Sequence, residues 1–302
     1  MAEFSEFFGG GSNLALTQTT NFFTSRTWVA PQNGILIMRA MGGGGGGALG
    51  SNATGGYSAS WGVKVVRVAK GATAVVTIGA GGAGRVSTDG DGGDGGHTTI
   101  VVNGVTYQAT GGLRGMLSAT AIPDVVAAGW GLPANWDFGA NGVKPGWVAS
   151  TGNTGGAGVD ILAKGNNATT SASSANSGGG GTGSASVNNI GGGANGTLDA
   201  LGNAWSSGSP YVDASNGEWG ISFYGGAGGP AGVAGANGGG GGSSGSTGFK
   251  GGNGGGGSGS ANGTGGAGGI GGGGGGSGSG AAAAGNGGPG FAHFKFFADL
   301  TV

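Results

Sequence analysis

The residues whose types suit metal or acid–base chemistry cluster in one run, between Asp89 and His97. Three aspartates alternate there with glycine, and an imidazole follows them. Carboxylate and imidazole groups at close spacing are cation ligands, but this spacing departs from the EF-hand loop and no glutamate closes it. Glycine also recurs at every third position of the run, at Gly90, Gly93 and Gly96. We therefore favour a solvated glycine-rich strand for this run, with a cation site as the alternative.

Catalytic groups are scarce in the rest of the chain. Only two histidines are present, His97 and His293, and His293 lies in an apolar terminal stretch that favours a structural role. The sequence contains no nucleophile elbow, no zinc motif and no Gly-Lys-Ser/Thr phosphate loop. A glycan-degrading enzyme would need a carboxylate pair, and only folding would bring candidates such as Asp137 and Asp213 together. The sequence predicts a protein that is not an enzyme and has no cofactor.

Aromatic side chains offer a different chemistry, that of binding. Five of the seven tryptophans fall in two segments, 129–147 and 205–219, where they mix with Asn, Ser, Gly and Pro. Rigid amphipathic rings beside adaptable polar groups are typical of binding loops. Alternatively, the rings pack on the flank of a structure that has few side chains of its own. The candidate receptor-binding residues are Trp130, Trp136, Phe138, Trp147, Trp205, Tyr211 and Trp219.

Several short runs are rich in β-branched residues and are predicted to form strands, which would position the aromatic segments. The runs 34–41, 60–68 and 73–78 have this composition, and 98–102 and 105–108 are joined by Asn103-Gly104. Asn-Gly accepts the positive φ angles of a type I′ turn, so the last two runs predict a β-hairpin. Short strands at this spacing indicate an antiparallel sandwich. The apolar run 291–302 is predicted to return to this sheet, because an unpaired apolar edge would promote aggregation.

Glycine dominates the remaining sequence, with 88 of 302 residues. Collagen has glycine at every third position throughout and abundant proline, whereas here the period is broken and only seven prolines are present, so collagen is excluded. A disordered linker is also disfavoured, because such linkers contain few aromatic residues. A period of three does appear in 226–241 and 263–280, matching the three residues per turn of polyproline II. Each run would form one extended helix of about 50 Å, and glycine would let neighbouring helices approach until their backbone groups pair. The alternative is a chance register in a disordered segment.

The predicted fold is mostly β and irregular: a small antiparallel β-sandwich with an inserted glycine-rich polyproline-II helix bundle. We expect an N-terminal docking segment at 1–21, a β-sandwich at 22–112 closed by strand 291–302, and the bundle with its aromatic loops at 113–288. Three phenylalanines near the N-terminus have helical i, i+3, i+4 spacing and could dock in a partner groove. These docking residues are Phe4, Phe7 and Phe8.

Charge and cysteine content exclude several partners. Eleven Lys and Arg residues balance twelve Asp and Glu residues, so no basic patch for nucleic acid is expected. The chain has no cysteine for disulfides, no apolar run long enough for membrane insertion and no basic stretch typical of a signal peptide. We therefore expect release from the cell by a route other than secretion, such as cell lysis.

The sequence also resembles a known group, the glycine-rich tail-fibre and receptor-binding (adhesin) proteins of bacteriophages. The similar elements are Trp-Val-Ala-Pro-Gln-Asn-Gly-Ile at 28–35, Ile-Met-Arg-Ala-Met before six glycines at 37–47, Tyr-Gln-Ala-Thr-Gly-Gly at 107–112, and Gly-Gly-Pro-Gly-Phe at 287–291. The resemblance covers most of residues 22–302, and its motifs are of low complexity. The match to tip adhesins is architectural only, because a strand-rich domain precedes the bundle here.

The resemblance implies a virion protein in which loops between glycine-rich helices contact a bacterial surface receptor, either a protein or a glycan. The N-terminus would bind another phage tail protein, and a homotrimer is one option for the assembly. Two alternatives from other classes stay open. One is a structural head or tail decoration protein, and the other is an ice-binding protein, some of which also use glycine-rich polyproline-II bundles.

Overall fold

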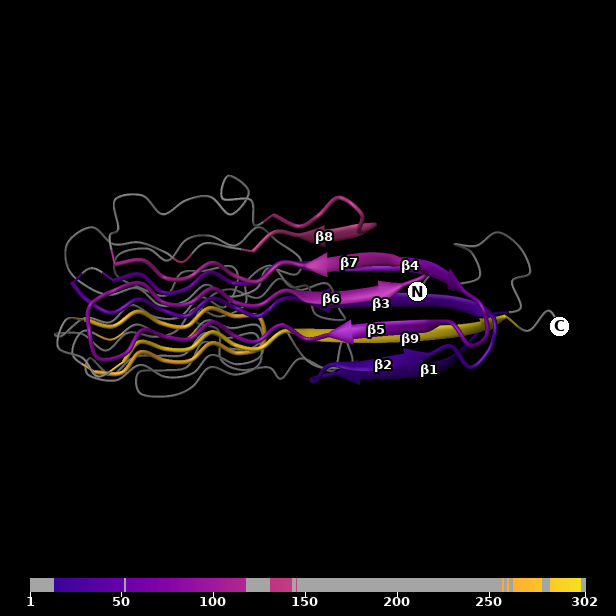
Figure 1. The fold of residues 1–302 in the computed structure, drawn as a ribbon, viewed down its shortest axis with the longest axis horizontal. Helices are drawn as coiled ribbons and strands as arrows, with labels where there is room; N and C mark the ends of the chain where they lie inside the picture. Colours follow the sequence, from indigo (N-terminus) through magenta and orange to yellow (C-terminus); the bar gives the residue numbers. More distant parts are fainter. Residues whose placement is uncertain are drawn as a thin grey trace, which may run out of the picture.

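The computed structural model describes residues 14–51, 53–117, 131–142, 145, 257, 260, 263–278 and 283–299. These residues form strands and extended glycine-rich segments, with no helix and hence none that could cross a membrane. Figure 1 shows the strands in one half of an elongated molecule and the glycine-rich segments in the other half. The described part of the chain is therefore all-β, in agreement with the predicted class.

The strands form two antiparallel sheets. Sheet A has the order β1 (Leu14–Phe22), β9 (Phe291–Asp299), β3 (Gly34–Met41), β4 (Trp61–Val68) and β8 (Phe138–Ala140). Sheet B has the order β2 (Arg26–Val29), β5 (Thr73–Thr77), β6 (Thr98–Val102) and β7 (Val105–Ala109). The C-terminal strand β9 therefore lies between two strands from the start of the chain, β1 and β3.

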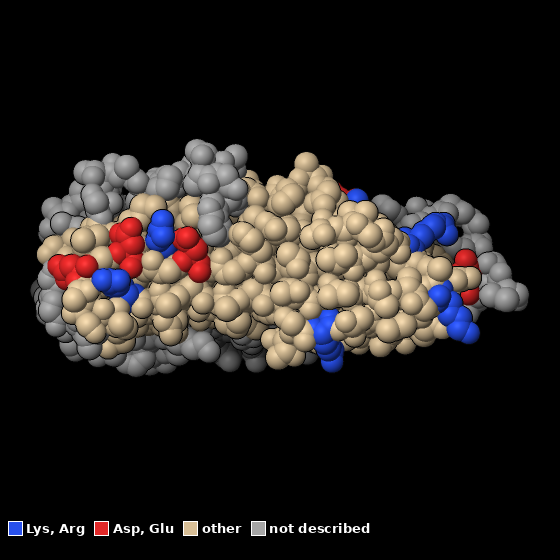
Figure 2. Space-filling view, viewed as in Figure 1, with Lys and Arg blue, Asp and Glu red and all other residues tan. Residues whose placement is uncertain are grey.

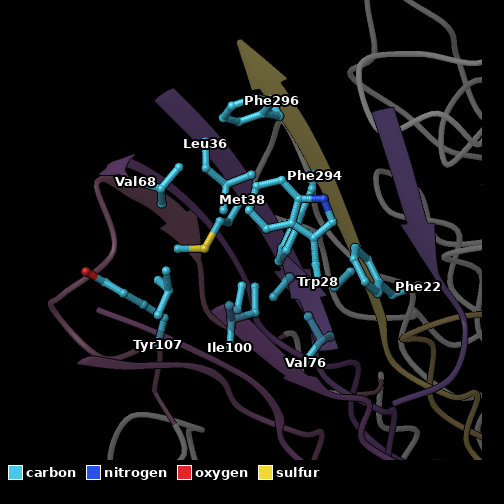
Figure 3. Packing of buried hydrophobic residues seen from close by; sticks show 14 of the residues in the cluster. Phe22, Trp28, Leu36, Met38, Val68, Val76, Ile100, Tyr107, Phe294 and Phe296 are labelled. Atoms are coloured by element: carbon cyan, nitrogen blue, oxygen red, sulfur yellow. The ribbon is translucent and has the colours of Figure 1, made fainter. Parts of the chain in front are cut away.

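The main hydrophobic core lies between the two sheets. Alternate residues of each strand face inward, so Leu36 and Met38 of β3 meet Phe294 and Phe296 of β9 and Ile100 of β6 in one cluster. Figure 3 shows these side chains converging. All five are at most 1 % exposed. Burying a side chain of this size contributes about 1.5–3 kcal/mol each.

Three predictions about this sandwich are confirmed. The β6–β7 hairpin turns at Asn103 (φ 51°) and Gly104 (φ 75°), the positive angles that the Asn-Gly pair predicts. The terminal strand, described as Phe291–Asp299, pairs with β1 and β3 of the N-terminal sheet. The strand runs at 34–41, 60–68 and 73–78 form β3, β4 and β5 with boundaries within one residue.

The strands continue into the glycine-rich half, where residues 42–50 form what we call the central segment. From residue 42 to residue 49, its N–H groups donate in turn to carbonyls of three neighbours, 54–60, 90–96 and 285–288, at 2.8–3.1 Å, and the rotation repeats. The N–H of Gly50 departs from this order and donates to Ser277. Residue numbers fall along each neighbour as they rise along the central segment, so all three neighbours are antiparallel to it. The direction of hydrogen bonding therefore turns once every three residues.

The carbonyl groups of the central segment follow the same rule with three other neighbours. From residue 43 to residue 48 they accept N–H bonds from segments 82–85, 112–115 and 274–277 at 2.7–3.1 Å, and each of these runs parallel to the central segment. Six segments therefore surround one, three as acceptors and three as donors. The buried backbone groups are satisfied although no β-ladder is present.

Glycine is required in the central segment because the neighbours touch its backbone. A Cβ atom added at Gly44 or Gly47 would overlap the carbonyl oxygen of Gly272 or Gly275, and one at Gly46 would overlap that of Ala83. Any side chain at these positions would push a neighbouring segment away and break its hydrogen bonds. The glycine content thus follows from close packing of backbones.

The division between sandwich and bundle differs from the predicted boundary at residue 112. The bundle includes 42–60, 79–97 and 110–117, because β3 to β7 each lead directly into or out of a glycine-rich segment. The predicted single helix at 263–280 is also wrong in its described part. The chain reverses at Ile270 and Gly271, where Gly271 has a φ of 69°. The other predicted helix, 226–241, lies outside the described residues.

Candidate functional site

The far end of the bundle carries a well-defined reversal, residues 85–90, which we call the distal turn. The bond from Gly43 to Gly96 lies next to the sandwich, and the bond from Leu49 to Gly90 lies at the opposite end. The chain leaves β5, runs the length of the bundle, reverses at the distal turn and returns to β6 (Figure 1). The turn is therefore the point of this chain excursion most distant from the strands.

Arg85 holds the distal turn in one conformation. Its Nε donates to the carbonyl of Thr88 at 3.1 Å, and its Nη2 donates to the Thr88 hydroxyl at 2.8 Å. Ser87 adopts a left-handed φ of 67°, which the surrounding bonds must stabilise. Val86, whose backbone forms a bridge with Ala283, has 57 % of its surface exposed. An apolar side chain on a rigid loop at a molecular end is a candidate binding element.

Aspartates next to the distal turn fasten neighbouring segments. Asp91 Oδ1 accepts the N–H of Leu117 at 2.8 Å, and Asp94 Oδ1 accepts the N–H of Arg114 at 2.9 Å. Figure 2 shows red and blue side chains alternating on the bundle half of this face. His97 Nδ1 accepts the N–H of Gly111 at 3.0 Å. Side chains of the 89–97 run thus accept hydrogen bonds from backbone N–H groups of neighbouring segments. The described residues contain no group of three metal-ligating side chains.

Two of the predicted receptor-binding residues are described, and they lie beside the sandwich. Trp136 is only 7 % exposed, its indole N–H donates to the carbonyl of Gln108 at 2.8 Å, and its ring lies 5.7 Å from that of Tyr107. A receptor has almost no access to this ring, so the packing interpretation applies to Trp136. Phe138 is 65 % exposed, with its ring 5.5 Å from Trp61.

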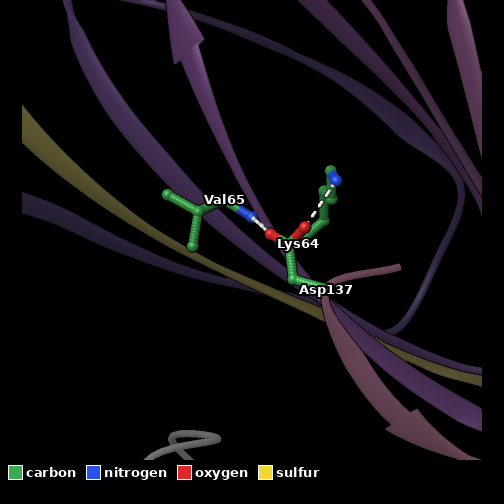
Figure 4. A network of polar contacts seen from close by, with 3 residues as sticks. All are labelled: Lys64, Val65 and Asp137. Carbon is green, nitrogen blue, oxygen red and sulfur yellow. Dashed lines mark hydrogen bonds and ion pairs between the residues drawn. The ribbon is translucent and has the colours of Figure 1, made fainter. Parts of the chain in front are cut away.

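Strand pairing explains why this part of the aromatic segment is not a reversal at the end of the bundle. Residues 138–140 form β8 against β4, and Asp137 accepts bonds from Lys64 Nζ and Val65 N–H (Figure 4). Partial burial acts to raise the pKa of Asp137, but these two hydrogen bonds and the charge of Lys64 together outweigh it and lower the pKa. The described part of 129–147 is therefore anchored along the edge of sheet A.

The other predicted site residues lie outside the described residues. They are Trp130, Trp147, Trp205, Tyr211 and Trp219 of the aromatic segments and Phe4, Phe7 and Phe8 of the N-terminus.

The distal turn is not among the predicted sites, although its Ser-Thr-Asp-Gly sequence at 87–90 is a turn signal.

A scan against models of known protein families found no match, and neither did a search of curated proteins. The chain itself folds as a β-sandwich from which a close-packed rod extends, with an ordered turn at its far end.

One buried histidine on sheet A has a measurable consequence. His293 is fully buried, and burial, with the charges of Arg39 and Lys295, lowers its pKa to about 3 from 6.5. The unfolded chain binds a proton near pH 6.5 while the folded chain does not, so stability falls as pH drops from that value towards 3. At about pH 5 the loss from this group is about 2 kcal/mol.

Urea unfolding of the parent and of His293→Gln at about pH 8 and pH 5 measures this effect. We expect the parent to lose more stability than the variant on acidification, because glutamine does not titrate. Equal losses in the two proteins would show that His293 is not responsible for acid sensitivity.

Proposed function

We propose that this protein is a phage tail-fibre or tail-tip adhesin that binds a bacterial surface receptor with the far end of its glycine-rich bundle. The observation that carries the proposal is the central segment, hydrogen-bonded to six neighbours, which extends from the end of β3 and lies beside the distal turn at Leu49 and Gly90. Such a rod holds a small binding surface at a fixed distance and orientation from an attachment domain. Rigid scaffolds with functional loops are a common arrangement for recognition.

The segments of the rod are proposed to be polyproline-II helices. A helix with three residues per turn presents successive N–H groups in three directions, which is the rotation found along residues 42–49. At a rise of about 3.1 Å per residue, these eight residues span about 25 Å. This assignment predicts φ near −75° and ψ near +145° along each segment.

Recognition is proposed to involve Val86 of the distal turn together with aromatic residues of 129–147 and 205–219. Trp136 is excluded because it is buried. Aromatic rings that stack on sugars or pack on outer-membrane loops suit either a glycan or a protein receptor. The aromatic residues retained are Trp130, Phe138, Trp147, Trp205, Tyr211 and Trp219.

Attachment to the virion is proposed at the opposite end, where the sandwich lies. Residues 1–13, with Phe4, Phe7 and Phe8, would contribute to contact with another tail protein. A homotrimer would be compatible with this arrangement. In this proposal the protein is made in the host cytoplasm, assembled into the virion tail and released by lysis.

Adsorption of the purified protein to host cells tests the receptor-binding proposal. We expect Val86→Asp and Trp147→Ala each to weaken binding about thirtyfold, the effect of losing one hot-spot contact of about 2 kcal/mol. Val105→Asp is a matched control, because Val105 is exposed at the hairpin of the sandwich, away from the distal turn. Full incorporation into virions without any cell binding by the parent would instead support a structural decoration protein.

An ice-binding function is the second candidate, favoured by the outer face of sheet B. Threonine and valine side chains occupy its exposed positions in regular rows across paired strands, as at Thr27, Val75, Val101 and Thr106. A flat array of this kind could order water. Thermal hysteresis in a solution of the protein would support it, and its absence would remove this candidate.

A further inference from the structure

The outer face of sheet A, turned away from sheet B, carries a strip of apolar and basic residues. In the register of β3 with β9, Ile35 pairs with Phe297, Ile37 with Lys295 and Arg39 with His293. These residues alternate with the inward-facing core residues, so their side chains lie on the opposite face. We call them the outer strip: Ile35, Ile37 and Arg39 of β3, and His293, Lys295 and Phe297 of β9.

Four of the six residues of the strip are buried although sheet B packs on the other side, and Lys295 and Phe297 are half-buried. Ile35 is 3 % exposed, Ile37 and Arg39 are 7 % exposed, and His293 is 0 % exposed. These exposed fractions hold for one chain without any partner, so the residues that shield the strip from water belong to the same chain. Among the described residues, Ile270 of the bundle packs on this face, beside Met41 at the end nearest the bundle. The rest of the strip needs another occupant.

We propose that the N-terminal segment, residues 1–13, packs on the outer strip of its own chain. Its sequence complements the strip in both polarity and charge. Phe4, Phe7 and Phe8 share one face at helical spacing and would cover the isoleucines, while Glu3 and Glu6 are acids opposite the cations of the strip. No other charged side chain is present in the segment.

Chain length and direction agree with this placement. The described chain begins at Leu14, which pairs with Asp299 at one end of β9. His293 lies six residues further along β9, or about 20 Å at 3.4 Å per residue. Residues 9–13, rich in glycine, span up to about 17 Å when extended. Residues 3–8 therefore reach the strip, one strand away from β1.

His293 identifies the chemistry that the occupant must supply. Its Nδ1 lies 2.7 Å from Asn21 Oδ1, an atom that only accepts, so Nδ1 carries the proton. Nε2 is then the unprotonated nitrogen of a neutral ring, and it is buried without a hydrogen-bond partner among the described residues. It requires a donor, which the hydroxyl of Ser5 or a backbone N–H of the segment provides.

This inference rests on sheet A alone and does not depend on receptor binding. If both hold, the sandwich with its docked segment forms the attachment end of the adhesin. Phe4, Phe7 and Phe8 would then contact sheet A directly and would contribute to virion attachment only by holding residues 1–13 on the sheet. A partner protein would therefore meet a preformed surface rather than a free tail.

Thiol labelling measures the cover directly, because the natural chain has no cysteine. Ile37→Cys is made in the full chain, alone and together with Phe4→Ser, Phe7→Ser and Phe8→Ser. We expect labelling to be at least about tenfold faster in the combined variant, since opening of the cover limits access. Val75→Cys, exposed on sheet B, should label equally fast in both backgrounds. Ile35→Cys is a second reporter should Ile37→Cys fold poorly.

A second cysteine at position 7 tests which chain supplies the segment. In the double variant Phe7→Cys, Ile37→Cys we expect an oxidised monomer linked within one chain. A disulfide-linked dimer would overturn the proposal in favour of exchange between two copies. Equal labelling of Ile37→Cys with and without the phenylalanines would overturn it in favour of a different occupant.

Discussion

Replacing Gly44 with alanine is expected to prevent the bundle from closing, with a cost above about 3 kcal/mol. Gly44 lies in the central segment, its N–H donates to Gly288 and its carbonyl accepts from Gly82. The added methyl group would overlap the carbonyl of Gly272 in a third neighbour. Overpacking in a side-chain core usually costs about 1–3 kcal/mol because side chains move aside. Here the obstacle is backbone, which cannot move without losing further hydrogen bonds.

Urea unfolding and soluble yield measure the effect of Gly44→Ala. Thr264→Val is the matched control, because Thr264 lies in another glycine-rich segment but is exposed, and we expect it to unfold at the same urea concentration as the parent. Unchanged stability of Gly44→Ala would mean that the central segment is not surrounded by backbone on this side.

The sequence predicts the sandwich well because its signals are local. Alternating apolar residues give β3 and β9 their inward faces, and Asn103-Gly104 specifies the hairpin turn. Pairing of the C-terminal strand with the N-terminal sheet is a long-range contact. It was predictable only because an apolar strand of that length needs partners on both edges.

The bundle is harder to predict because glycine specifies no direction. Six consecutive glycines at 42–47 do not indicate which neighbour each residue contacts, since the contacts are made by identical backbone groups. The reversal at Gly271 likewise lies within a run of glycines, where any residue can adopt a positive φ. Period and composition therefore indicate the type of packing but not the path of the chain.

The candidate site shows a similar division. A tryptophan in a polar, glycine-rich segment suits a binding loop and a packing role equally. Trp136 takes the packing role because Gly62 of β4 has no side chain and leaves room for the indole ring. That relation joins residues far apart in sequence and appears only in the fold. The distal turn has a local turn signal, but its position at the far end depends on the paths of β5 and β6.

Deletion of residues 291–302 is expected to leave an insoluble chain, the largest effect after loss of the central segment. β9 is hydrogen-bonded on both edges, to β1 and to β3. Its removal takes Phe294 and Phe296 from the core and exposes the edge of β3, an eight-residue strand that is buried throughout. An exposed apolar edge of this length promotes aggregation. Soluble, folded protein after the deletion would show that the strand is dispensable.

A graded version of this experiment separates packing from aggregation. Phe294→Ala keeps the strand but removes a ring that lies 4.6 Å from Phe22 and 5.8 Å from Trp28, and we expect a loss of about 3–5 kcal/mol in urea unfolding. Val75→Ala, at an exposed position of sheet B, should change stability by less than about 0.5 kcal/mol. If Phe294→Ala were as mild as Val75→Ala, the core between the sheets would not depend on the C-terminal strand, and closure of the sandwich by that strand would not explain its stability.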